Sequence, residues 1–177
     1  MNCPKCQGYH LKPKKLDNGL IALSCDHCKG SLLSIVQFIQ WRDTQETKGN
    51  TSQTICEIDE TSDLIYCPKC SGFMTKYQIS NQTHNRLDLC FRCYETWIDS
   101  GEWQLLQQLD LQKNLESIFS EKWQKHLLLK NVEENAEKRI KNHFGNAFNK
   151  INAFKMWLDT YDKKNDVIDY LKKRKPK

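Results

Sequence analysis

The spacing of hydrophobic residues divides the chain into two regions with different predicted structure. In the first region, short stretches alternate between apolar and polar residues around polar turns such as Asp17-Asn18-Gly19, which predicts β-hairpins. Each hairpin is followed by a short helical pattern that opens on a capping box, Ser34-x-x-Gln37 and later Asp99-x-x-Glu102. We therefore expect two similar hairpin-plus-helix units, in which Asp99 and Glu102 cap a helix rather than form a catalytic pair.

In the second region, beyond residue 102, apolar residues recur every three or four positions and no proline occurs before Arg174. This spacing predicts helices, and one apolar stripe continues along a long helix. The stripe consists of Leu129, Val132, Ala136, Ile140, Phe144, Ala147, Ile151, Phe154, Leu158 and Tyr161. We expect the stripe to fold back onto the apolar residues of 103–128; self-association through 129–161 and docking onto a protein partner are the alternatives.

Between the hairpin units, residues 42–63 are polar and acidic, which predicts a flexible linker. Cys56 within it has no second cysteine at close spacing, so we expect a reduced, unpaired thiol. The predicted organisation is a first unit over 1–41, the linker over 42–63, a second unit over 64–110, and an α-helical region with a basic end over 111–177.

Eight of the nine cysteines form four Cys-x-x-Cys pairs, and these pairs fall into the same two units. The first set is Cys3, Cys6, Cys25 and Cys28, and the second is Cys67, Cys70, Cys90 and Cys93. Two cysteines separated by two residues turn both sulfurs toward one point, and two such knuckles joined by a hairpin complete a tetrahedral four-sulfur site. We predict two Zn²⁺ ions per chain, each bound within its own repeat. Iron in a rubredoxin-like site and a cross-braced arrangement of the ligands are the alternatives.

Residues around the second set of cysteines extend the pattern. They read Cys67-Pro-Lys-Cys70-x-Gly72-x-Met74, then Cys90-x-x-Cys93-x-x-x-Trp97-x-Asp99-x-Gly101-Glu102-x-x-x-Leu106. This pattern resembles the transcription factor IIB-type zinc-ribbon family of small bacterial proteins, closely over 64–106 and more loosely over 1–41. The fold class we expect is a small zinc-stabilised α+β protein. It would contain two tandem zinc ribbons, each a knuckle, a β-hairpin, a second knuckle and a short helix, followed by a long α-helical C-terminal region.

The chain departs from the family pattern at several positions. Glu95 stands where a glycine is usual. The first repeat keeps Gly30 there, but it has Leu32, Ser34 and Gln37 in place of the Trp, Asp and Glu. Zinc ribbons serve nucleic-acid and protein contacts alike, so the resemblance implies zinc and the ribbon fold and does not imply one function.

Charge is unevenly distributed around the formal net value of +5. Residues 138–177 hold twelve Lys and Arg against four Asp and Glu, whereas residues 42–66 hold two against six. A basic region of this kind suits a polyanion such as nucleic acid, or serves solubility alone. No leader pattern opens the sequence and no apolar run reaches the ~18 residues of a membrane span, so we expect a cytoplasmic protein without membrane contact.

No set of catalytic residues accompanies the cysteines. Four thiolates would fill the coordination shell of a metal ion, and the motifs of zinc proteases, serine hydrolases and P-loops are absent. His27 lies inside a knuckle, and we expect its side chain to point outward. We therefore expect a protein that is not an enzyme.

The function that these features predict is a zinc-binding adaptor for RNA, DNA or a nucleoprotein complex of transcription or translation. Its basic hairpins and basic helical tail would make the contacts, with Tyr77 and Phe91 near the second hairpin. The candidate contact residues are Tyr9, Lys12, Lys14, Lys15, Lys76, Arg86, Arg92, Lys172, Lys173, Arg174 and Lys175. The alternatives are a protein-interaction scaffold that docks through the amphipathic C-terminal helix without nucleic acid, and a rubredoxin-like iron electron carrier.

Overall fold

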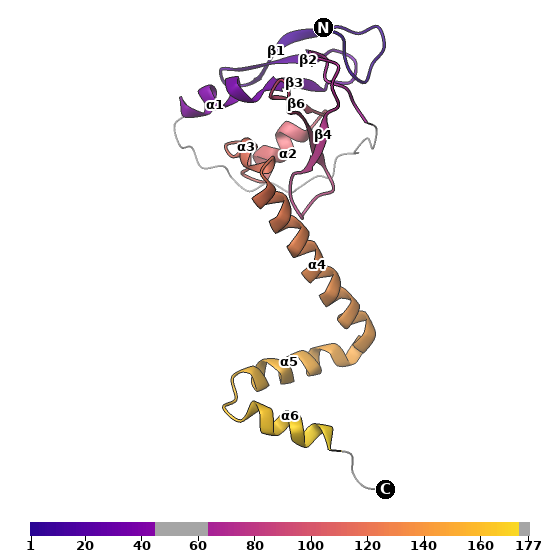
Figure 1. Cartoon of the computed structure of the whole chain (residues 1–177), viewed down its shortest axis with the longest axis vertical. Helices are drawn as coiled ribbons and strands as arrows, with labels where there is room; N and C mark the ends of the chain where they lie inside the picture. The colour runs from indigo at the N-terminus through magenta and orange to yellow at the C-terminus, as the bar shows by residue number, and fades with distance from the viewer. Residues whose placement is uncertain (45–63, 174–177) are drawn as a thin grey trace. The chain divides into compact units, whose positions relative to one another are not determined.

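Each cysteine repeat folds into three antiparallel strands followed by a helix, as the computed structural model shows (Figure 1). The first repeat contains β1 (Leu11–Asp17), β2 (Leu20–Cys25), β3 (Ser31–Ser34) and α1 (Ile35–Asp43). The second contains β4 (Thr75–Gln78), β5 (Arg86–Cys90), β6 (Glu95–Ile98) and α2 (Glu102–Gln108). The structure describes residues 1–44 and 64–173, so the predicted linker and Cys56 lie outside the described residues.

The third strand of each repeat differs from the sequence prediction, which placed a helix directly after the second knuckle. β3 and β6 are each four residues long and almost entirely buried. Because neither face of these strands meets water, no alternation of apolar and polar residues marks them in the sequence. Ser34 occupies the N-cap position of α1, but its side chain does not make the hydrogen bond of a capping box.

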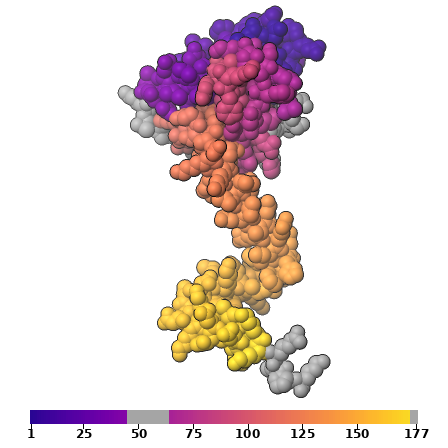
Figure 2. Space-filling view, in the orientation of Figure 1, coloured from indigo at the N-terminus to yellow at the C-terminus, as the bar shows by residue number. Residues whose placement is uncertain are grey.

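The two repeats join into a single six-stranded antiparallel sheet with the strand order β1-β2-β3-β6-β5-β4. At the junction of β3 with β6, Leu32 lies opposite Trp97. These two residues hold the same place in the two sequence repeats, so a pseudo-twofold axis passes between them. Both repeats belong to one compact unit, residues 1–130, and Figure 2 shows the first (indigo to purple) beside the second (magenta). The two ribbons are therefore parts of one folded unit.

Helices cover one face of this sheet. Alternate residues of the central strands, such as Ala22, Leu33 and Ile98, enter a core that they share with α1, α2 and the short helix α3 (Leu115–Ile118). The helical residues of this core are Ile35, Phe38, Trp103, Leu105, Leu106, Leu115 and Ile118. The main apolar residues of 103–128 are thus buried here against the ribbons, and the packing of the apolar stripe onto that segment stays a prediction.

The C-terminal region is divided into three helices, whereas the sequence predicted one long helix bearing the stripe. α4 (Glu121–Phe144) ends at Gly145, whose φ of +49° is left-handed, and a short 3-10 turn leads into α5 (Phe148–Asp159) and α6 (Lys164–Lys172). The second compact unit, residues 131–177, has no buried residue in its described part. Its large exposed stripe members are Val132, Ile140, Phe144, Ile151, Phe154 and Tyr161. Among the described helices, none has the length and apolar composition to cross a bilayer.

Candidate metal centres and neighbouring surfaces

The eight cysteines predicted as metal ligands gather into two groups of four, one in each repeat. Within each group, all four Sγ atoms lie within 4.8 Å of one another. In both repeats one cysteine pair precedes the first strand and the other begins at the end of the second strand, so the hairpin returns the second knuckle to the first. Each group takes all its sulfurs from one repeat, so the cross-braced alternative is wrong.

The sulfur positions fit a tetrahedral metal ion. Sγ of Cys3 lies 3.7 Å from Sγ of Cys28, and Sγ of Cys70 lies 3.6 Å from Sγ of Cys90. Thiolates bound at about 2.3 Å around a tetrahedral ion are separated by about 3.8 Å. None of the eight cysteines forms a disulfide, so four thiols are available as ligands in each group.

Backbone N–H groups of the knuckles favour the ionised thiolate in each group. The N–H of Gly72 is the main cause that lowers the pKa of Cys70 to about 7. Burial raises the pKa of Cys25, but the N–H groups of Cys28 and His27, together with the thiols of Cys3 and Cys28, outweigh burial and lower the pKa to about 7. In the opposite direction, the neighbouring Cys70 thiol raises the pKa of Cys93 to about 12. A full set of four thiolates therefore requires a cation at its centre.

His27 is close to the first group without belonging to it. Its Nδ1 lies 3.4 Å from Sγ of Cys6, and its exposed ring lies 4.5 Å from the ring of Tyr9. His27 is thus exposed, as expected for a side chain that points outward, but its ring also contacts a sulfur of the group. Because all four sulfur positions in the group are already filled by cysteines, His27 touches a ligand and is not needed as one.

Both cysteine groups border one buried cluster on the sheet face opposite the helices. Leu32 and Trp97 lie at its centre, where they pair across β3 and β6. A Cβ atom on Gly30 would come within 2.3 Å of the Trp97 ring, so the ring occupies the space that a side chain would need. By the pseudo-twofold relation, Glu95 lies beside Leu32, a smaller side chain. This difference explains why glycine is required in the first repeat and not in the second.

Asp99 has a different role from the predicted helix cap. Its side chain accepts hydrogen bonds from Lys5 Nζ at 2.5 Å and from Trp97 Nε1 at 2.8 Å. Gly101 occupies the N-cap position of α2, and no side chain caps this helix. The reciprocal contact of the capping box is present, because Glu102 accepts a hydrogen bond from the Asp99 N–H at 2.8 Å. Asp99 therefore links Lys5 of the first repeat to the second repeat.

The predicted nucleic-acid contacts of the first hairpin lie along β1, which is one edge of the sheet. Lys12, Lys14 and Lys15 are all exposed there, and Lys12 forms an ion pair of 2.8 Å with Asp26. Tyr9 is 43% exposed beside His27. The structure thus presents these lysines together on one strand.

The other predicted contacts are more dispersed. Lys76 is largely buried and forms an ion pair of 3.1 Å with the buried carboxylate of Asp88, so its role as a surface contact is wrong. Arg86 and Arg92 are exposed. Lys172 and Lys173 are exposed in the second compact unit, whereas Arg174 and Lys175 lie outside the described residues.

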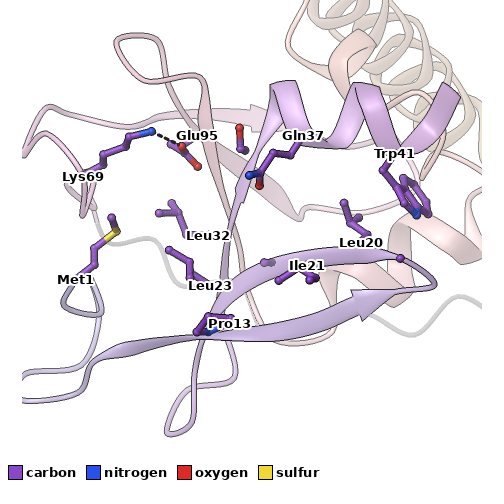
Figure 3. A pocket seen from close by; sticks show the side chains of 13 residues that line it. Met1, Pro13, Leu20, Ile21, Leu23, Leu32, Gln37, Trp41, Lys69 and Glu95 are labelled. Carbon is purple, nitrogen blue, oxygen red and sulfur yellow. Dashed lines mark hydrogen bonds and ion pairs between the residues drawn. The ribbon is translucent and has the colours of Figure 1, made fainter. Parts of the chain in front are cut away.

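A groove of about 600 Å³ runs across the first repeat (Figure 3). Its wall is mainly apolar, with Ile21, Leu23 and Leu32 along the strands, and Trp41 of α1 closes one end. At the other end Lys69 and Glu95 form an ion pair of 2.9 Å. The groove therefore offers apolar contact surface, and its two oppositely charged side chains satisfy each other.

Comparison of the chain with known protein families, with curated proteins and with solved structures finds no match.

Proposed function

We propose that this protein is a zinc-binding adaptor that holds two Zn²⁺ ions and binds nucleic acid or a nucleoprotein complex. Two sets of four thiols within 4.8 Å support zinc, because a closed four-sulfur shell is typical of structural zinc. In such a shell the ion has no open position for water or substrate, so it stabilises the fold and takes no part in a reaction. Elemental analysis should find about two zinc per chain; a coloured, iron-containing protein would support the electron-carrier alternative.

The observation that carries the nucleic-acid proposal is the row of exposed lysines on β1. Lys12, Lys14 and Lys15 project from one edge strand, and that strand is held by pairing with β2 and by the first metal centre. Clustered cations on a rigid strand bind phosphates by releasing the counterions of the polyanion. Lysine and proline also protect edge strands from pairing with other chains, so binding has to be measured separately from folding.

The test is a binding titration of zinc-loaded protein with labelled RNA and DNA at several salt concentrations. Replacing both Lys14 and Lys15 by Glu should weaken binding and flatten its dependence on salt. The control replaces Lys122 and Lys125, two exposed lysines of α4, by Glu and makes the same change in net charge. If the control weakens binding equally, or if the parent binds neither polymer at low salt, the proposal fails.

A second function, as a protein-interaction scaffold, is favoured by the second compact unit. Between residues 131 and 173 no side chain is buried, although Phe154 and Trp157 are large and apolar and are 42% and 48% exposed. Apolar surface of this kind marks contact sites in many proteins. This function uses a different unit from the β1 lysines, so one chain could have both.

A further inference from the structure

The two repeats share a scaffold but differ in their exposed residues beside the cysteines. In the second repeat these residues are aromatic: Tyr66, Phe73, Phe91 and Tyr94, which are 53%, 64%, 54% and 57% exposed. The same positions of the first repeat hold Asn2, Tyr9, Asp26 and Lys29. Of these four, only Tyr9 is aromatic. Because the first repeat builds equivalent strands and an equivalent four-sulfur group with one ring at these positions, the fold does not require the additional three.

The four aromatic residues flank the cysteines of one sulfur group in the sequence. Each lies within three residues of a cysteine of the second group, and the four sulfurs of that group are within 4.8 Å of one another. The rings of Tyr66 and Phe73 are 4.7 Å apart, and their backbones form a β-bridge. A Cβ atom on Gly72 would lie 3.4 Å from Cδ of Arg92, so the arginine stem passes beside the residue that precedes Phe73.

This surface, the aromatic knuckle (Tyr66, Phe73, Phe91, Arg92 and Tyr94), combines ring faces with a cation. Exposed rings stack on nucleic-acid bases whatever their sequence, and an arginine beside them binds phosphate or stacks as well. A duplex hides its base faces within its own stack, whereas an unpaired strand presents them. The first repeat places an aspartate, Asp26, where the second has Phe91, and an aspartate would repel phosphate.

We propose that the aromatic knuckle binds an unpaired strand of nucleic acid by base stacking. This inference rests on the proposed function and adds a ligand class to it: single-stranded RNA or DNA. The β1 lysines and the aromatic knuckle then have different roles. The lysines of β1 hold phosphates without distinguishing single strands from duplexes, and the aromatic knuckle provides the preference for unpaired bases.

The experiment compares a labelled single strand, oligo(dT) or oligo(rU), with a duplex of the same length, longer than the ~16 nucleotides that one small binding fold covers. The zinc-loaded full chain should bind the single strand more tightly. Phe73→Ala should weaken single-strand binding at least about fivefold, the lower range for loss of one stacked base, and leave duplex binding unchanged. Phe73→Trp should keep the affinity, whereas Phe73→Leu, which remains apolar, should not restore it.

Tyr170→Ala is the control, since Tyr170 is an aromatic residue of α6 that is 75% exposed and lies outside both repeats. Zinc content and circular dichroism show whether each variant is folded, and exposure of Phe73 makes loss of the fold an unexpected result. If Tyr170→Ala and Phe73→Ala weaken binding equally, or if Phe73→Leu binds as the parent does, the stacking proposal is overturned while the nucleic-acid adaptor stands. Binding of neither polymer would overturn both.

Discussion

At the scale of single residues, Gly30 shows how one absent side chain lets the two repeats meet. A Cβ atom there would lie 2.3 Å from the Trp97 ring, which is fully buried among close-packed neighbours. We expect Gly30→Ala to lower the free energy of unfolding by about 1–3 kcal/mol, the usual cost of overpacking a core. Urea unfolding of the zinc-loaded protein measures this change.

Gly72→Ala provides the comparison for that experiment. A Cβ atom at Gly72 would meet its nearest neighbours, Arg92 and Cys70, at 3.4 Å, which is an ordinary contact distance. We therefore expect a much smaller loss of stability than for Gly30→Ala. Similar losses in the two variants would mean that the knuckle backbone, and not the approach of Trp97, sets the need for glycine at residue 30.

Glu102 should give the fold a distinct pH dependence. Burial raises the pKa of its carboxyl to about 8 from an ordinary value of 4.5, and the charges of Asp99 and Asp88 act in the same direction. Between these pH values the folded state holds a proton that the unfolded state releases, so the free energy of unfolding falls as pH rises from about 4.5 to 8. Glu102→Gln removes the titrating carboxyl, and with it this pH dependence, but the glutamine still offers an oxygen to the Asp99 N–H.

The measurement is the difference in unfolding free energy between Glu102→Gln and the parent, taken by urea titration at several pH values. The cysteine thiols also titrate, but they are the same in both proteins and cancel in the difference. The variant should gain stability relative to the parent as pH rises toward 8. A difference that is constant with pH would show that Glu102 is ionised in the folded protein at all these values.

At the scale of elements, the sequence predicts what depends on local pattern and misses what depends on distant partners. The hairpins and the two sulfur groups follow from alternation and from cysteine spacing. β3 and β6 do not, because four-residue strands buried on both faces lack a periodic signal. The role of Asp99 depends on Lys5, which lies 94 residues earlier in the chain. The end of α4 depends on a left-handed φ at Gly145, and a single glycine in the sequence does not predict that conformation.

Two helices of the C-terminal region differ in how far their apolar residues are buried, and the difference can be measured as a change in stability. Phe154 on α5 is 42% exposed, whereas Leu127 on α4 is only 4% exposed, within the first compact unit. Phe154→Asp should cost less than about 1 kcal/mol of stability, because the carboxylate keeps its water. Leu127→Asp should cost several kcal/mol, since the carboxylate would be buried without a partner. Denaturant unfolding followed by circular dichroism tests both variants.

Sedimentation of Phe154→Asp beside the parent tests whether the exposed stripe contacts a second copy of the chain. If a second copy of the chain covers α5, the Phe154→Asp variant should sediment with a lower mass than the parent. The metal content per chain should be the same in both proteins. A large loss of stability in Phe154→Asp would contradict the exposure of this residue and favour internal packing of the stripe.

At the scale of the whole molecule, shared structure connects the two four-sulfur groups. The repeats pair through β3 and β6, they bury residues in common on both faces of the sheet, and Lys5 of the first repeat bonds to Asp99 of the second. Loss of either centre should therefore disturb both repeats, because elements packed in one core unfold together. This coupling distinguishes the fold from two independent ribbons on a flexible chain.

Cys6→Ser and Cys93→Ser, which each remove one sulfur from a different centre, test this coupling. Since metal binding contributes folding free energy directly, each variant should lose on the order of several kcal/mol of stability. Hydrogen exchange should become faster in both β2 and β5 whichever cysteine is replaced, and each variant should unfold in one transition. Elemental analysis reports how many metal ions remain. If exchange accelerates only in the repeat that carries the substitution, the two ribbons are energetically independent although they share a sheet.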